Sequence, residues 1–245
     1  MVKEMIGVVI VGGDQPRSKN LFKDLQDSGF FHVAIQPRIY ESNLAGMHDV
    51  AISSAIAYGR ALSISERCCS LAHRLAQEKL AKSGGIILED DAVVLDVRAL
   101  ANFAAQVIDS DKSVLLNFST LKCAEDVDWD LTNNSIIRTF APSALAVGYA
   151  GSGAALRQLI EANCSLEYVA DWPPISAKHL RLKYPIVAHG YRNSTSLILD
   201  NTNRAHVPIF ELVIRKQIIA ALGRVKSKVL FEFAKAILWL RSAEK

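Results

Sequence analysis

The sequence predicts a three-layer α/β domain built around a mostly parallel sheet. Short apolar runs rich in β-branched residues alternate with longer segments rich in Ala, Leu, Arg, Gln and Lys, and glycines or acidic residues follow several of these runs. The chain has 245 residues, 50% of them hydrophobic, which is enough to bury one substantial core. Composition therefore excludes a disordered chain, a collagen and a disulfide scaffold.

The first half of the chain supplies two strands and three helices. Residues 6–11 form an apolar run ended by Gly12 and Gly13, as in a buried strand, and residues 32–35 form the next strand. Between them, residues 18–28 place apolar side chains on one helical face. Residues 51–61 and 66–81 are rich in strong helix formers, and the second of these helices stops before two glycines.

The second half repeats the alternation. A strand over residues 86–88 runs directly into three acidic residues, and a helix over 95–108 follows. A strand is expected at 114–118, and another at 144–149 leads into a helix over 152–162. This order of elements is typical of a sheet with helices on both faces.

Charge divides the chain into a domain over residues 1–204 and a basic tail over 205–245. The whole chain carries a net charge of +3, too weak to indicate nucleic-acid binding, but the tail carries +5 and the domain −2. Apolar side chains of the tail form one helical stripe, with Arg224, Lys228 and Lys235 opposite. This pattern favours a helix on an anionic membrane surface, or one packed on the domain or on a second subunit.

Cysteine spacing and hydropathy indicate the compartment. The four cysteines show no Cys-x-x-Cys spacing, which is typical of a reduced, cytosolic protein. The apolar run at 5–11 lacks the features of a signal peptide, and no apolar run reaches the length of a spanning helix. We therefore expect a cytoplasmic protein, peripheral at the inner face of the membrane through its tail.

The acidic run Glu89, Asp90 and Asp91 is the strongest functional signal. Three consecutive carboxylates repel one another, so a cation or a basic partner must compensate them. Ligands of open α/β sheets bind beyond the carboxyl ends of the strands, where this run falls. Hard divalent cations prefer carboxylate oxygens and recruit substrate phosphates, and Glu89 and Asp91 are spaced to share one ion. The alternative is an acidic turn that faces solvent or pairs with arginines.

The segment before this run carries a family resemblance. Glu66, Cys69, Leu71 and His73, followed by a strand ending in Leu-Glu-Asp-Asp, are similar to glycosyltransferase family 25, the lipooligosaccharide sugar transferases. The family pattern is approximately Gly-Glu-x-Gly-Cys-x-Leu-Ser-His, and here Ser65, Cys68 and Ala72 replace both glycines and the serine. Weaker similarities extend the resemblance to roughly residues 6–200.

The resemblance implies a GT-A-like, Rossmann-like nucleotide-sugar transferase. Such an enzyme moves galactose or glucose from a UDP-sugar, with inversion, to a lipopolysaccharide, lipooligosaccharide or related surface-glycan acceptor. It implies a divalent metal, Mn²⁺ or alternatively Mg²⁺, held by Glu89 and Asp91. His189 is a further candidate metal ligand, with a surface histidine as the alternative.

Other candidate site residues follow from this interpretation. Inverting transfer needs a base for the acceptor hydroxyl, for which Asp171 is the candidate, and the Trp172 ring offers a face for acceptor sugar. The donor-binding candidates are Arg17 for the diphosphate, Asp90 for donor hydroxyls, and Glu66.

Three of the motif residues have structural alternatives. Glu66 opens a predicted helix and could cap it instead of binding the donor. We interpret His73 as a buried, hydrogen-bonded histidine rather than a metal ligand, and Cys69 as a small core residue rather than a nucleophile. The replaced glycines also leave open a non-catalytic relative that acts as a sugar-binding or assembly subunit.

Overall fold

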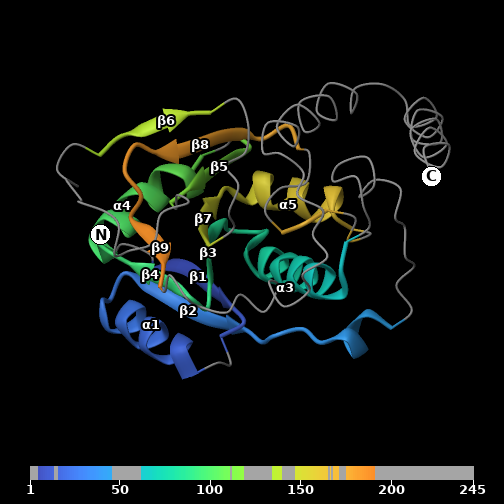
Figure 1. Cartoon of the computed structure of the whole chain (residues 1–245). Helices are drawn as coiled ribbons and strands as arrows, with labels where there is room; N and C mark the ends of the chain where they lie inside the picture. Colours follow the sequence, from blue (N-terminus) through green and yellow to red (C-terminus); the bar gives the residue numbers. More distant parts are fainter. Residues whose placement is uncertain are drawn as a thin grey trace, which may run out of the picture.

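A seven-stranded sheet forms the centre of the computed structural model (Figure 1). The structure describes residues 5–13, 16–45, 62–110, 112–118, 134–139, 147–164, 166, 168–170 and 175–190. In spatial order the strands are β2 (Phe31–Gln36), β1 (Ile6–Val11), β3 (Gly85–Glu89), β7 (Gly148–Gly151), β5 (Val114–Asn117), β8 (Lys178–Leu182) and β6 (Ile136–Arg138).

Strand directions make this a mixed sheet that is largely parallel. β1 pairs in parallel with β2 and β3, and β5 pairs in parallel with β8. β7 is antiparallel to both of its neighbours, and β6 is antiparallel to β8. All the described strands of this sheet except β7 and β6 therefore run in one direction, so the carboxyl ends of β1, β3 and β5 meet at the same edge. The predicted α/β class with a mostly parallel sheet is confirmed, and the arrangement is compatible with a Rossmann-like fold.

Helices cover both faces of the sheet (Figure 1). α1 (Pro16–Asp27) and α4 (Val97–Ile108) pack on one face, against side chains such as Ile10 and Leu88. α3 (Ile64–Leu80) and α5 (Gly153–Ala162) pack on the other, against Val9 and Ile87. Successive strand residues point to opposite faces, so the continuous apolar runs of β1 and β3 fill both cores.

A small second sheet and a 3₁₀ turn complete the described fold. A two-stranded antiparallel sheet joins β4 (Ala92–Val94), directly after the acidic run, to β9 (Val187–His189). A 3₁₀ turn, η1 (Glu41–Leu44), packs near α3. No helix within the described ranges is long and apolar enough to cross a membrane.

The predicted elements match the structure closely where it describes them. The helices expected at 18–28, 66–81, 95–108 and 152–162 correspond to α1, α3, α4 and α5. The strands expected at 6–11, 32–35, 86–88 and 114–118 correspond to β1, β2, β3 and β5, while β7 occupies the end of the strand expected at 144–149. The helix predicted at 51–61 and the tail at 205–245 lie outside the described residues.

Candidate metal and ligand site

The acidic run lies at the turn between β3 and β4, beside the end of β1. Val11 pairs with Glu89, so the two strands end together, and Gly12 follows with a positive φ of 73°. A Cβ atom at Gly12 would lie 3.3 Å from Cγ of Asp90 and would meet its carboxylate. Glycine is therefore favoured at position 12 by its positive φ, and a larger residue there would press against the Asp90 side chain.

Glu89 points toward the α3 face of the sheet and meets a buried histidine. His73, which is 1% exposed, has its Nε2 atom 3.2 Å from Oε1 of Glu89. Its Nδ1 atom lies 3.4 Å from the Tyr149 hydroxyl, which accepts a 3.0 Å hydrogen bond from Nε2 of Gln77. All three hydrogen bonds can form together if the Tyr149 hydroxyl donates to Nδ1 of His73 and the Nε2–H group of His73 donates to the Glu89 carboxylate. The predicted burial and hydrogen bonding of His73 are confirmed.

Cys69 joins His73 and Glu89 in a cluster that could hold a metal ion. One ligand atom from each of the three side chains lies within 4.8 Å of the other two. In the part of the chain that the structure describes, this is the one group of three such side chains. Cys69 and His73 are four residues apart on α3, so both face the end of β3.

Asp91 meets a different histidine. β4 and β9 pair in a register that places Ala92 opposite His189, and the amide of Gly190 donates to the carbonyl of Asp91 at 2.8 Å. Oδ2 of Asp91 lies 3.5 Å from Nδ1 of His189, and the two side chains are 16% and 25% exposed. The small sheet thus brings together two of the three predicted metal ligands.

The third predicted ligand, Glu89, does not lie in one close group with Asp91 and His189. Glu89 continues the alternation of β3 and shares the face of Ile87, where α3 packs. The chain then turns at Asp90, and Asp91 opens β4, whose partner is β9. Two residues spaced by two positions share one side of a sheet only when both belong to the same regular strand. Here β3 ends at Glu89, so the rule does not extend to Asp91.

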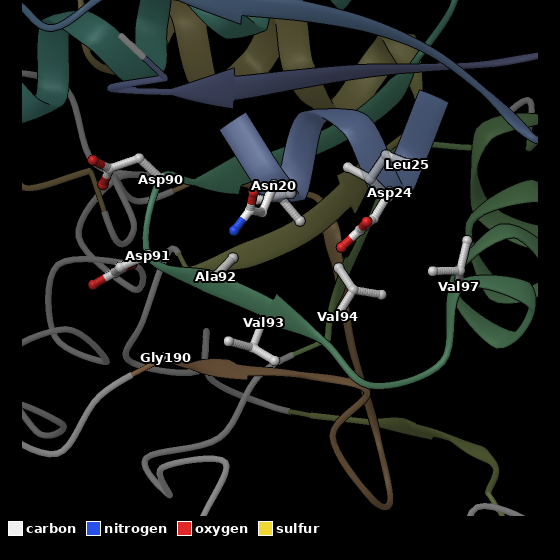
Figure 2. A pocket seen from close by; sticks show the side chains of 11 residues that line it. Asn20, Asp24, Leu25, Asp90, Asp91, Ala92, Val93, Val94, Val97 and Gly190 are labelled. Carbon is white, nitrogen blue, oxygen red and sulfur yellow. The ribbon is translucent and has the colours of Figure 1, made fainter. Parts of the chain in front are cut away.

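A cleft borders Asp90 and Asp91 on the α1 side of the turn (Figure 2). Its volume is about 260 Å³, below the roughly 300–1,000 Å³ of typical ligand pockets. Asn20 and Asp24 of α1 also line it. In Figure 2, the side chains of Asp90 and Asp91 project to the same side of the turn. Sequence reasoning missed Asp24, because an exposed acidic residue on an amphipathic helix carries no local signal of a site.

The remaining candidates make other contacts or lie outside the described part. Glu66 forms a capping box with Ser63 at the start of α3. The Glu66 carboxylate accepts a 2.9 Å hydrogen bond from the Ser63 amide, and the Ser63 hydroxyl accepts a 3.2 Å hydrogen bond from the Glu66 amide. The capping alternative for Glu66 is thus what the structure shows. Arg17 lies in the first turn of α1. Its side chain, together with Asp171 and Trp172, lies outside the described residues.

Cys68, beside Cys69 on α3, belongs to a separate apolar cluster with Leu44, Leu71 and Leu166. Burial raises the pKa of the Cys68 thiol, and the nearby Glu41 carboxylate raises it further. The positive charges of Arg38 and Arg67 lower this pKa, but by less. Cys68 is therefore a core thiol, and the adjacent cysteines have different environments. Among the described cysteines, Cys68, Cys69 and Cys164 form no disulfide.

No protein-family model matches the chain, and no curated protein matches it significantly.

Proposed function

We propose that the chain is a metal-dependent, inverting glycosyltransferase that moves galactose or glucose from a UDP-sugar to a lipopolysaccharide, lipooligosaccharide or related surface-glycan acceptor. The observation that carries this proposal is the position of Asp90 and Asp91. Both follow β3 at the sheet edge where β1 also ends, and both line a cleft. Nucleotide ligands of open α/β sheets bind at such an edge, and the motif resemblance to glycosyltransferase family 25 includes these residues.

The donor atoms around Asp91 fit a hard divalent cation. Oδ2 of Asp91 and Nδ1 of His189 converge to 3.5 Å, and carboxylate and imidazole together suit Mn²⁺, with Mg²⁺ as the alternative. Asp24 and Asp90 also line the cleft that Asp91 borders. Because only one or two side chains would hold the cation, diphosphate oxygens of the donor would complete its shell. Bound there, the cation would offset the negative charge on the departing nucleotide.

The protein groups have separate tasks in the transfer. Asp90, held against Gly12, offers its carboxylate to hydroxyls of the donor. The acceptor hydroxyl attacks the anomeric carbon and loses its proton to Asp171, while the bond from that carbon to the diphosphate breaks. Trp172 provides a stacking face for the acceptor sugar. The roles of Asp171 and Trp172 come from the sequence resemblance.

Hydrolysis of the donor tests the proposal without knowledge of the acceptor. The full-length protein should slowly cleave UDP-galactose or UDP-glucose in a Mn²⁺-dependent manner, measured as released UDP. Asp91→Asn removes a charged ligand and should lower turnover by at least about 10²-fold. Asp109→Asn, at an exposed position that ends α4, is the matched control and should retain activity.

The outcomes separate the transferase from its alternative. Full activity of Asp91→Asn, or of the wild type in excess chelator, would overturn the metal assignment. Binding of a UDP-sugar without cleavage, measured by thermal shift, would indicate a non-catalytic sugar-binding relative. If the protein neither binds nor cleaves any of the UDP-sugars tested, the proposal is overturned.

Asp171 has its own test. A general base contributes about 10²–10⁴-fold to turnover, so Asp171→Asn should lower kcat on that scale and leave the affinity for the donor nearly unchanged. The measurement is steady-state transfer or hydrolysis together with donor binding by calorimetry. An effect confined to the KM for the acceptor would make Asp171 a binding residue instead.

A further inference from the structure

We propose that Cys69, His73 and Glu89 bind one zinc ion, at a site separate from the cation proposed at Asp91 and His189. Sγ of Cys69, Nε2 of His73 and a carboxylate oxygen of Glu89 are the three protein ligands, and water takes the fourth position. The site joins α3 to the end of β3. It goes beyond the proposed function, because it concerns the opposite face of the turn and needs no donor.

The geometry of the three side chains suits a tetrahedral ion. Cys69 and His73 are spaced four residues apart on one helix, the spacing that presents two ligands on one face. The His73 Nε2 to Glu89 Oε1 distance of 3.2 Å is close to the roughly 3.3–3.7 Å that separates ligand atoms around one zinc ion. The three ligand atoms already lie within 4.8 Å of one another, so small side-chain adjustments would let one ion contact all three.

Charge and ligand chemistry select zinc over the harder cations. On binding, the Cys69 thiol releases its proton to solvent, and the thiolate and the Glu89 carboxylate together neutralise the two charges of Zn²⁺. A neutral cluster avoids the cost of an unpaired charge next to His73, which is 1% exposed. Thiolate and imidazole favour zinc, whereas Mg²⁺ and Mn²⁺ favour carboxylates and water.

The residues behind His73 can support either state of its ring. Without metal, Nε2–H donates to Glu89 and Nδ1 accepts from the Tyr149 hydroxyl. With Nε2 on zinc, Nδ1–H would donate to the Tyr149 oxygen, and the Tyr149 hydroxyl would donate to Oε1 of Gln77 once that side-chain amide is turned over. Such hydrogen-bonded partners fix the ring orientation of metal-binding histidines. The buried Gln77 and Tyr149 provide this support.

The glutamate also provides access. Glu89 is 24% exposed, while His73 lies behind it, so an ion would reach the site from the side of the turn. The same exposed side would leave the fourth coordination position of the ion open to water. Three protein ligands and one water is a common zinc arrangement.

Metal content of the full-length protein, with any metal-binding tag removed, tests the proposal. After removal of metal and incubation with zinc, the protein should retain about one zinc per chain through gel filtration. Cys69→Ser and His73→Gln should lose it, whereas Cys164→Ser, at an exposed thiol, should retain it. Asp91→Asn should also retain it, which separates this site from the proposed catalytic cation.

Cobalt substitution of the wild type tests thiolate ligation without any variant. Co²⁺ in the site should give a thiolate-to-cobalt charge-transfer band and the strong visible bands of a tetrahedral ion, and Cys69→Ser should lack the charge-transfer band. Absence of stoichiometric zinc in the wild type, or a charge-transfer band that persists in Cys69→Ser, would overturn the proposal. Because neither readout involves a sugar donor, failure of the glycosyltransferase assay would leave this result unaffected.

Discussion

Tyr149 holds the hydrogen-bonded chain behind Glu89, and we expect its hydroxyl to stabilise the fold. The ring is 2% exposed, and the hydroxyl contacts both Gln77 and His73. Tyr149→Phe would leave two buried polar groups without this partner, a change that costs about 1–3 kcal/mol. Urea unfolding should therefore show a lower midpoint with an unchanged slope.

Tyr40→Phe is the matched control for this change. The Tyr40 ring is 55% exposed and lies against Arg38, a contact that phenylalanine retains. The free energy of unfolding of Tyr40→Phe should stay within about 0.5 kcal/mol of the wild-type value. Equal effects of the two substitutions would show that the buried hydroxyl contributes nothing specific.

Single residues were predictable where the chain order alone determines their surroundings. Glu89, Asp90 and Asp91 follow a buried strand, so their place at the sheet edge could be read from the sequence. Gln77 and Tyr149 were not predicted, because their contact joins α3 to β7 over 72 residues of sequence. The closeness of Cys69 to Glu89 could not be read from the sequence for the same reason, because the two residues belong to different elements.

At the scale of elements, hydrophobic patterns predict β1, β2, β3, β5 and part of β7, but they indicate neither the strand directions nor the strands β4, β6, β8 and β9. The run before α5 reads as a buried strand whether it lies parallel or antiparallel to its neighbours, and β7 is antiparallel to both. The three-residue strands β4 and β9 are too short to show a period. Their pairing nevertheless places His189 beside Asp91, so the candidate metal pair depends on an element that the pattern could not reveal.

Strand β8 carries a histidine that should make stability depend on pH. Burial lowers the pKa of His179 below its ordinary value of 6.5, against a smaller raising effect of a hydrogen bond with the Ile175 backbone. The unfolded chain therefore takes up a proton at a higher pH than the folded chain does. Stability from this group is fully present above about pH 6.5 and declines as the pH falls through and below that value.

The measurement is urea unfolding at pH 7.5 and pH 5.5. The wild type should lose more stability over this interval than His179→Gln, because glutamine does not titrate. His32→Gln, at an exposed position of β2, is the control and should retain the pH dependence of the wild type. Identical pH dependence in the wild type and His179→Gln would contradict the assignment.

At the scale of the whole molecule, the fold and the proposed reaction are inferred from different features of the sequence. The alternation of apolar runs and helix formers determines the layers, since burial of both sheet faces requires helices on each side. Composition does not specify a reaction, because one α/β architecture supports many. Glycosyl transfer is inferred from a few motif residues and from the position of Asp90 and Asp91 at the sheet edge where β1 and β3 end.

The charge difference between residues 1–204 and 205–245 predicts how the whole molecule partitions. We expect the full-length protein to co-sediment with vesicles that contain anionic lipid. Each cation near such a surface contributes about 1 kcal/mol, so replacing Arg224, Lys228 and Lys235 by glutamine should weaken binding by roughly 10²-fold. The predicted apolar stripe supplies the remaining affinity, and high salt should therefore weaken binding only in part.

A second triple variant separates local charge from net charge. Arg98, Lys112 and Lys178 are exposed on the described domain, and their replacement by glutamine removes the same total charge. If the tail is the membrane-binding element, this variant should bind vesicles nearly as well as the wild type, because charges beyond a Debye length of the surface contribute little. Equal losses in the two variants would mean that overall charge drives binding. Equal binding of the wild type to neutral and anionic vesicles would remove the electrostatic contribution and leave the apolar stripe alone to account for the affinity.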